Sequence, residues 1–287
     1  MVNTNKLTIF VSGVSSGIGR ATAEYFLNMG HTVIGTVRKI EDADFFKNQY
    51  VDNFHVFVGD LTHFENNLNI IQLFEDKNIH SCDVVVHNAG LAVAGPIEYQ
   101  NFAEVQHLMN LNVLSVIQLT QILLPYLKKA KKPGRIINIS SVSGVGGTPF
   151  LGAYCATKHA IEGLSESLRR ELRLYGMKVI VIGPGSIKTP IWDKGFSLVS
   201  KLYQQTEYAQ SFQKFIDFAS HEKDHALDVS EVVHFINKAV FSKNPCLRYA
   251  PVPRKLINWY LPKIIPKKIY DYLMCRALDL IVSKKDI

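Results

Sequence analysis

Cysteine is scarce in this sequence, and its few residues stand far apart. Cys82, Cys155, Cys246 and Cys275 are the only four in 287 residues, and none belongs to a Cys-x-x-Cys pair. This spacing indicates neither a zinc site nor a dense disulfide framework, so we expect no metal centre. A reducing compartment such as the cytoplasm fits this cysteine usage best.

Long apolar runs are also missing. No stretch of about 18 uninterrupted apolar residues offers a bilayer span, and the apolar run at 7–11 is too short for a signal peptide core. The eleven prolines and eighteen glycines follow no triplet period, which excludes collagen-like and low-complexity classes. With 47% apolar and 20% charged residues, the composition predicts a globular protein that is soluble or at most lies on a membrane.

Short β-branched runs alternate with longer segments of helical period. This alternation predicts repeated βαβ units, and therefore an α/β protein with a doubly wound, mostly parallel sheet and helices on both faces. Because such crossovers are right-handed, the first three strands should extend one way from the centre and the next three the other way. The predicted strands lie at 7–11, 32–37, 54–58, 83–87, 135–139 and 178–182, and the helical segments near 17–29, 63–78, 101–129 and 152–175.

The chain shows no internal boundary before its C-terminal part. No Pro/Gly/Ser-rich linker and no internal repeat interrupts the alternation of strands and helices. We therefore predict one core domain over 1–250, followed by a basic and aromatic helical extension over 251–287. Ligand is expected in the crevice beyond the carboxyl ends of the strands, where the strand order reverses.

A glycine-rich segment, Ser12-Gly13-Val14-Ser15-Ser16-Gly17-Ile18-Gly19, follows the first predicted strand. Glycine allows the backbone to turn tightly and to approach a pyrophosphate without a Cβ in the way, and the N–H groups at a helix start attract phosphate. The position between a strand and a helix that begins near Gly17 therefore indicates a dinucleotide site. A bare structural turn is the alternative, because a glycine-rich loop alone is weak evidence.

Tyr154 and Lys158 are four residues apart and so share one face of the helix predicted from about Gly152. A phenol is a poor acid or base at neutral pH, but an adjacent ammonium favours the phenolate and should lower the phenol's pKa. Ser141 ends the fifth predicted strand, where its hydroxyl could bind a substrate carbonyl. These residues predict a proton-transfer site, although Tyr and Lys at this spacing also occur by chance on solvated faces.

Together these motifs resemble those of the short-chain dehydrogenase/reductases. The resemblance covers about 5–250 and points to the single-domain branch, in which cofactor and catalytic sites share one Rossmann unit, on its steroid and retinol dehydrogenase side. The matching motifs are Gly13-x-x-x-Gly17-x-Gly19, Asn88-Ala89-Gly90, Leu111-Asn112-Val113, Ser141, Tyr154-Cys155-Ala156-Thr157-Lys158 and Pro184-Gly185-Ser186-Ile187-Lys188-Thr189.

The resemblance implies a role for each matched residue. Tyr154 would donate the proton in reduction and accept it in oxidation, Lys158 would lower its pKa and bind the nicotinamide ribose, and Ser141 would polarise the substrate oxygen. Asn112 would hold a water that links Lys158 to solvent. Ser12 departs from the family's usual Thr, but its hydroxyl can still bond backbone. The implied cofactor-binding residues are Gly13, Ser15, Ser16, Gly17, Ile18, Gly19, Arg38, Asp60, Leu61, Asn88, Ala89, Gly90, Tyr154, Lys158, Pro184, Gly185, Ile187 and Thr189.

Val37 and Arg38, at the end of the second predicted strand, favour NADP(H) over NAD(H). An acidic residue there would accept the ribose hydroxyls of NAD and repel a 2′-phosphate, whereas an arginine neutralises that phosphate. In the resembling family, NAD enzymes usually carry Asp where this chain has Val37. The alternative is a solvated Arg38 beside Lys39, which some NAD enzymes tolerate.

The segment at about 186–226 would be the lid that varies most in this family. Its apolar side chains suit a lipophilic alcohol or ketone of steroid, retinoid or lipid type, or else only pack the lid on the core. The function implied is an NADP(H)-dependent oxidoreductase that interconverts an alcohol and a carbonyl. A 3-oxoacyl-thioester reductase and a non-catalytic dinucleotide-binding redox sensor or scaffold are the alternatives. The apolar lid residues are Ile191, Trp192, Phe196, Leu198, Val199, Leu202, Tyr203, Phe212, Phe215 and Phe218.

Basic and aromatic residues alternate along the extension at 251–287. Such mixing predicts an interfacial membrane segment, or a tail that packs on the core or at a subunit interface, and no nucleic-acid module is visible. Family helices near 101–129 and 152–175 usually pair between subunits, so a homodimer or homotetramer is expected.

Overall fold

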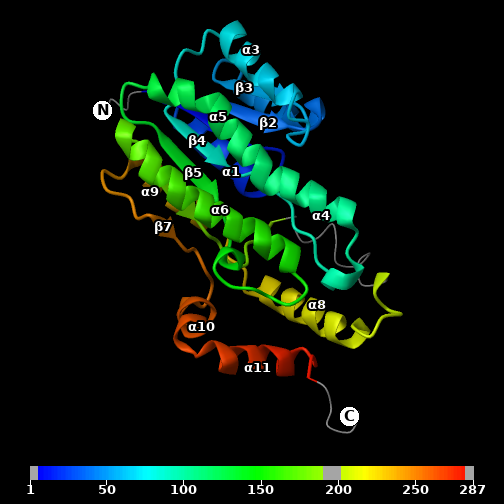
Figure 1. The fold of residues 1–287 in the computed structure, drawn as a ribbon. Helices are drawn as coiled ribbons and strands as arrows, with labels where there is room; N and C mark the ends of the chain where they lie inside the picture. The colour runs from blue at the N-terminus through cyan, green and yellow to red at the C-terminus, as the bar shows by residue number, and fades with distance from the viewer. Residues whose placement is uncertain (1–5, 190–201, 282–287) are drawn as a thin grey trace.

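In the computed structural model, residues 6–189 and 202–281 are described, and they contain a seven-stranded parallel sheet (Figure 1). The strand order is β3-β2-β1-β4-β5-β6-β7, so the predicted reversal beside β1 is confirmed. β7 was not predicted, because a two-residue strand carries no periodic signal. The strands are β1 Thr8–Val11, β2 Thr32–Val37, β3 Phe54–Val58, β4 Val84–His87, β5 Arg135–Ile139, β6 Lys178–Ile182 and β7 Arg248–Tyr249.

Helices cover both faces of the sheet, as predicted (Figure 1). On one face, α1 (Gly17–Asn28) and α9 (Val229–Phe241) pack on β1, β2 and β6, and the short α2 (Asp44–Gln49) packs on the same face. On the other face, α3 (Asn69–Asp76) and α5 (Ser115–Lys128) pack on β1, β4 and β5. The helix α6 (Gly152–Glu171) runs beside α5 and carries Tyr154 and Lys158.

The span Phe102–Lys128 is long and apolar enough to cross a membrane by length and composition, and half of its most apolar window is buried. It consists of α4 (Phe102–Met109), a π-helical turn η4 (Asn110–Leu114) and α5. Leu119 and Leu123 of α5 are fully buried against the sheet. This packing is what the core helix of a folded domain shows, and the span is therefore weak evidence for a membrane crossing.

The expected lid is described only in part, because Ile191, Trp192, Phe196, Leu198 and Val199 lie outside the described residues. In the described part, α8 (Ala209–Asp224) buries Phe212 and Phe215 in a separate apolar cluster, whereas Phe218 of the same helix is exposed, as is Leu202. The packing alternative thus accounts for the buried lid residues. Members of that cluster are Ala94, Phe150, Leu151, Cys155, Tyr203, Phe212, Phe215 and Leu278.

The C-terminal extension lies at the end of the molecule away from β3 (Figure 1). It contains a π-helical turn η7 (Leu256–Tyr260), α10 (Leu261–Ile264) and α11 (Lys267–Ala277), and none of these has a buried residue. Leu278, directly after α11, is buried in the α8 cluster. The extension therefore contacts the rest of the protein near its start and at Leu278, while many of its apolar side chains are exposed.

Candidate active site

The loop after β1 needs glycine at two places for different reasons. Gly13 has φ +71°, a left-handed conformation that side chains rarely adopt. Gly19, in α1, would place a Cβ 2.1 Å from the Gly13 carbonyl oxygen and 2.3 Å from Asn88 Nδ2. The loop and the first turn of α1 are thus pressed against each other and against the segment after β4.

Hydrogen bonds fix this loop to the ends of β2 and β4. The Ser12 hydroxyl accepts from the backbone N–H of Asn88 at 2.9 Å and of Ala89 at 3.0 Å. Asn88 Nδ2 in turn donates to the carbonyls of Ser12 and Gly13, and the Gly13 N–H donates to Thr36 Oγ1 at 2.9 Å. Ser12 bonds backbone as its hydroxyl was expected to, so the change from Thr does not disturb the loop.

The start of α1 is suited to phosphate. Ser16 precedes the helix without capping it through its side chain, and the first turn holds no acidic residue. The first N–H groups of a helix have no partners within it, and the helix dipole favours an anion at this end. With no carboxylate in competition, the loop and helix start fit the pyrophosphate of a dinucleotide.

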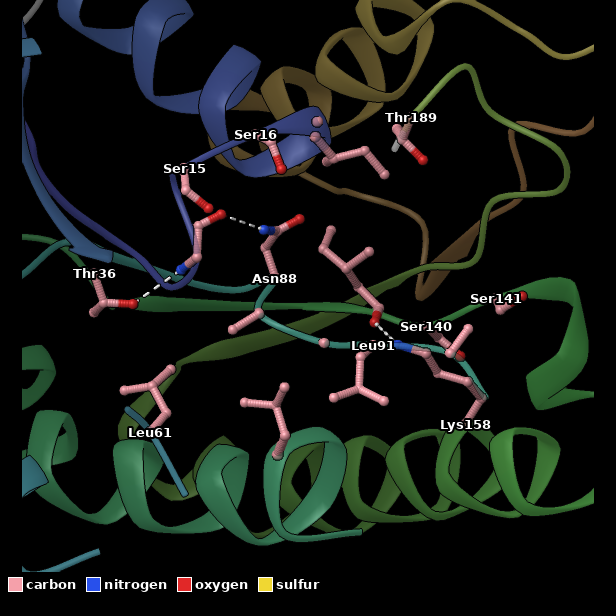
Figure 2. A pocket seen from close by; sticks show the side chains of 18 of the residues that line it. Ser15, Ser16, Thr36, Leu61, Asn88, Leu91, Ser140, Ser141, Lys158 and Thr189 are labelled. Carbon is pink, nitrogen blue, oxygen red and sulfur yellow. Dashed lines mark hydrogen bonds between the residues drawn. The ribbon is translucent and has the colours of Figure 1, made fainter. Parts of the chain in front are cut away.

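A cleft of about 430 Å³ runs along the carboxyl ends of the strands. Of the predicted site residues, Gly19 and Asn112 do not line it, and all others do. Figure 2 shows Ser15, Ser16 and Thr36 at one end, Ser141 and Lys158 at the other, and Asn88 and Leu91 between them. Sequence reasoning did not assign these further lining residues to the site: Thr36, Gly59, Leu91, Ala92, His107, Leu111, Ile139 and Ser140.

The structure brings Ser141, Tyr154 and Lys158 together. Lys158 and Tyr154 are both buried, and the ammonium lies 5.7 Å from the centre of the phenol ring. Lys158 Nζ donates to the Ile139 carbonyl at 3.0 Å, which ties the helix α6 to the end of β5. A hydrogen bond with Ser141 stabilises the ionised form of Tyr154. The three side chains therefore form one polar group at the end of the cleft.

The expected lowering of the Tyr154 pKa is not seen. Burial raises the pKa of Tyr154 to about 12, and the Ser141 hydrogen bond lowers it only in part. Burial likewise lowers the pKa of Lys158 to about 8, against the raising effect of the Glu162 carboxylate. Desolvation outweighs the Ser141 hydrogen bond because the phenol is buried, so Tyr154 stays a protonated phenol.

Asn112 lies behind the cleft, within the π-helical turn η4, with its side chain bonded to protein. Its Nδ2 donates to the Leu91 carbonyl at 2.9 Å and to Thr157 Oγ1 at 3.1 Å, and its Oδ1 accepts from the Leu91 N–H at 3.0 Å. These bonds join the α4–α5 span, the irregular segment after β4 and α6. The role of Asn112 in holding a water stays a prediction.

Charged groups stand at the other end of the cleft. Arg38 is exposed there, directly after the buried Val37, and Asp60 follows β3. Burial tends to raise the pKa of Asp60, but hydrogen bonds from the Thr62 N–H and hydroxyl lower it below its ordinary value. The cleft thus offers a cation and a carboxylate at the end opposite Tyr154. No group of His, Cys, Asp or Glu that could hold a metal occurs among the described residues.

Comparison with known proteins agrees with this geometry. The NADPH-dependent 3-dehydrocapnine reductase of Ornithobacterium rhinotracheale is 37% identical over 272 residues, which cover 93% of this chain and 96% of that protein. The 3-ketodihydrosphingosine reductase of Bacteroides thetaiotaomicron is 34% identical over 243 residues, covering 84% and 86%. A short-chain dehydrogenase from Streptomyces avermitilis superposes with a TM-score of 0.73 at 27% identity, over 91% of this chain and 94% of that one.

The family model of the short chain dehydrogenases matches residues 7–197, which include the glycine loop, Ser141, Tyr154 and Lys158. The expected family and fold are therefore confirmed: this chain belongs to the short-chain dehydrogenase family of oxidoreductases.

Proposed function

We propose that this protein is an NADP(H)-dependent oxidoreductase that interconverts an alcohol and a carbonyl on a lipophilic substrate. The observation that carries the proposal is one continuous cleft with the glycine loop at one end and Ser141, Tyr154 and Lys158 at the other. In this proposal residues 1–250 form the catalytic domain and 251–287 an accessory extension. A bound nicotinamide would supply or accept the hydride.

Tyr154 donates the proton in the reducing direction. Its raised pKa keeps the phenol protonated at neutral pH, which is the state that a proton donor needs. Ser141 stabilises the phenolate left behind through their hydrogen bond, and its hydroxyl polarises the substrate oxygen. Lys158, with a pKa of about 8, is mostly charged at neutral pH and favours the same phenolate. Asn112 supports α6 next to this group and holds a relay water.

NADP(H) is the cofactor favoured by the charge at the far end of the cleft. The Arg38 guanidinium can bind a 2′-phosphate, and Val37 offers no carboxylate to repel it. Gly13, Ser15, Ser16, Gly17 and Ile18 would hold the phosphates, and the other predicted lining residues would contact the adenine and the nicotinamide. The relative from Ornithobacterium rhinotracheale, whose name includes NADPH, supports this assignment.

A lipophilic substrate is supported by apolar lining next to the catalytic group. Leu91, Ala92 and Ile187 line the cleft together with Ser141 and Tyr154. The name 3-ketodihydrosphingosine reductase, given to a relative 34% identical to this chain, describes a ketone on a long-chain base. We therefore favour a long-chain ketone over the 3-oxoacyl-thioester alternative. The intact Tyr154 and Lys158 argue against a non-catalytic sensor.

We also propose peripheral contact with an anionic membrane surface, from the cytoplasmic side, and assembly into a homo-oligomer. Leu256 and Ile264 of the extension are each 77% exposed, among exposed lysines at 255, 263, 267 and 268. Exposed apolar side chains between cations suit the headgroup region of an anionic bilayer. The outer sides of the α4–α5 span and α6 are the surfaces proposed for subunit pairing.

A panel of carbonyl compounds, followed by absorbance of the reduced cofactor, tests the proposed function. The panel pairs a long-chain 3-ketone, a steroid ketone, retinal and a 3-oxoacyl thioester with NADPH and with NADH. We expect the fastest turnover with a lipophilic ketone and NADPH. Preference for the thioester would favour the alternative reductase, and NADPH binding without turnover of any compound would favour a sensor.

A further inference from the structure

A charged cluster lies directly behind the catalytic group, and neither cofactor binding nor proton transfer accounts for it. Glu162 lies one helical turn after Lys158 on α6 and accepts from the Ser140 hydroxyl at 2.7 Å. Arg248, on β7, donates from Nε to both carboxylate oxygens of Glu162, at 3.0 and 3.2 Å. Both side chains are only 19% exposed, so water screens their attraction less than at the surface.

This ion pair reaches the proposed catalytic residues by two routes. Arg248 Nη2 donates to the backbone carbonyl of Ser141 at 3.0 Å, so the guanidinium binds the residue that faces the substrate oxygen. The Glu162 carboxylate acts on Lys158 through its charge, as it opposes the larger effect of burial on the lysine's pKa. The hydrogen bonds that the pair makes go to Ser140 and Ser141, both at the catalytic end of the cleft.

The surrounding backbone leaves room for the pair. A Cβ on Gly183, directly after β6, would lie 2.0 Å from Arg248 Nη2. A Cβ on Gly144 would lie 2.6 Å from Ser140 Oγ and 3.0 Å from Glu162 Cγ. Both positions admit only glycine while Arg248 and Glu162 keep these places, because contacts this short require something to move.

The C-terminal extension contributes an aromatic ring to the cluster. The Arg248 guanidinium carbon lies 4.5 Å from the ring centre of Trp259, in η7, and Lys263 Nζ lies 3.4 Å from the same ring. A cation against the face of Trp is attracted to it, more strongly where water is partly excluded. Trp259 is half-buried, whereas its neighbour Tyr260 is exposed. The Trp259 ring thus restricts the movement of the Arg248 guanidinium.

We propose, resting on the function proposed above, that Arg248 and Glu162 are positioning residues for Ser141 and Lys158, and that Trp259 couples the extension to them. The titratable and charged groups of this cluster are Glu162 and Arg248, and those around it are Tyr154, Lys158 and Lys263. Loss of the arginine frees the Ser141 carbonyl and leaves Glu162 unpaired. Loss of Trp259 loosens the arginine, so the extension affects turnover without lining the cleft.

The test compares Arg248→Met, Glu162→Gln, Trp259→Ala and Trp259→Phe with the wild type, using a ketone from the panel and NADPH. Arg248→Met should lower kcat by roughly tenfold to a hundredfold, the scale of a misplaced reacting group, with NADPH affinity unchanged. Trp259→Ala should lower kcat in the same direction, and Trp259→Phe should retain most of it. Tyr272→Ala, on the exposed part of α11, is the matched aromatic control and should leave kcat unchanged.

The pH profile of kcat separates positioning from a merely structural role. The basic limb of this profile is expected to follow the loss of the proton from Lys158. Glu162→Gln removes an anion that raises the pKa of Lys158, so the basic limb should move to lower pH. Arg248→Met removes a cation from the same pair, so that limb should move to higher pH. If Arg248→Met fails to fold, Arg248→Lys keeps the charge but loses the fork that joins Glu162 to Ser141, and it carries the test.

Wild-type kcat in Arg248→Met, or limbs that move the same way in both variants, would overturn the proposal. Absence of turnover by the wild type would refute the proposed function instead. In that case crystal structures of the wild type and Arg248→Met decide the inference: displacement of the Ser141 carbonyl supports it, and an unmoved carbonyl overturns it.

Discussion

Gly19 is the position where one added methyl group should damage the cofactor site most. In Gly19→Ala the Cβ would stand 2.1 Å from the Gly13 carbonyl oxygen and 2.3 Å from Asn88 Nδ2. Neither neighbour is the free end of a flexible side chain, because Asn88 Nδ2 already bonds the carbonyls of Ser12 and Gly13. Overpacking of this kind costs about 1–3 kcal/mol, which corresponds to a fall in Tm of roughly 2–12 °C for a protein near this size.

Thermal unfolding and NADPH titration, both read by fluorescence, measure the two consequences. We expect Gly19→Ala to unfold at lower temperature and to bind NADPH more weakly, since the loop that meets the phosphates has to move. Gly163→Ala is the matched control, because Gly163 is also a helical glycine and a Cβ there meets nothing within 4 Å. It should gain up to about 1 kcal/mol from helix propensity. Equal stability and equal NADPH affinity in Gly19→Ala and the wild type would refute this account of the loop.

Three further predictions concern charge. Arg38→Ala removes a charge-assisted bond worth about 1.5–3 kcal/mol, so calorimetry should find NADPH affinity reduced roughly 10- to 150-fold and NADH affinity little changed. Equal weakening of both affinities would contradict the assignment of NADP(H) as the cofactor. Burial lowers the pKa of Lys158 to about 8 from 10.5, so above pH 8 the folded chain releases a proton that the unfolded chain keeps. The free energy of unfolding, measured relative to Lys158→Met, should therefore rise from about pH 8 to 10. If this difference does not change with pH, Lys158 is not desolvated. Co-sedimentation with anionic vesicles should fall as salt is added, because charge is screened over about 10 Å at 0.1 M salt. It should also fall when the lysines at 267–268 are replaced by glutamates, but not when the exposed lysines at 131–132 are replaced in the same way. An equal loss with both pairs would show that the extension has no specific role in vesicle binding.

Local pattern predicted the sheet well because most of its strands are compact runs of β-branched or aromatic residues. The runs at 32–37, 54–58, 135–139 and 178–182 coincide with β2, β3, β5 and β6. Their order follows from the handedness of the crossovers, which does not depend on side-chain detail. β7 escaped prediction because its two residues join the sheet only through β6.

The candidate site was predicted as far as motif and spacing extend. The glycine loop, Ser141, Tyr154 and Lys158 line one cleft. The raised pKa of Tyr154 could not be predicted, because it depends on how completely the folded chain excludes water. The ion pair of Glu162 with Arg248 was also missed, since 86 residues separate the partners and neither carries a local pattern.

Turnover of Tyr154→Phe tests the central claim most directly. The substitution keeps the buried ring and removes the hydroxyl that Ser141 binds. The rate of ketone reduction by NADPH, measured where chemistry limits, should fall by about 10²- to 10⁴-fold, the usual contribution of general acid catalysis, while NADPH affinity stays that of the wild type. A variant that retains more than about a tenth of the wild-type rate under these conditions would contradict the assignment of Tyr154 as the proton donor.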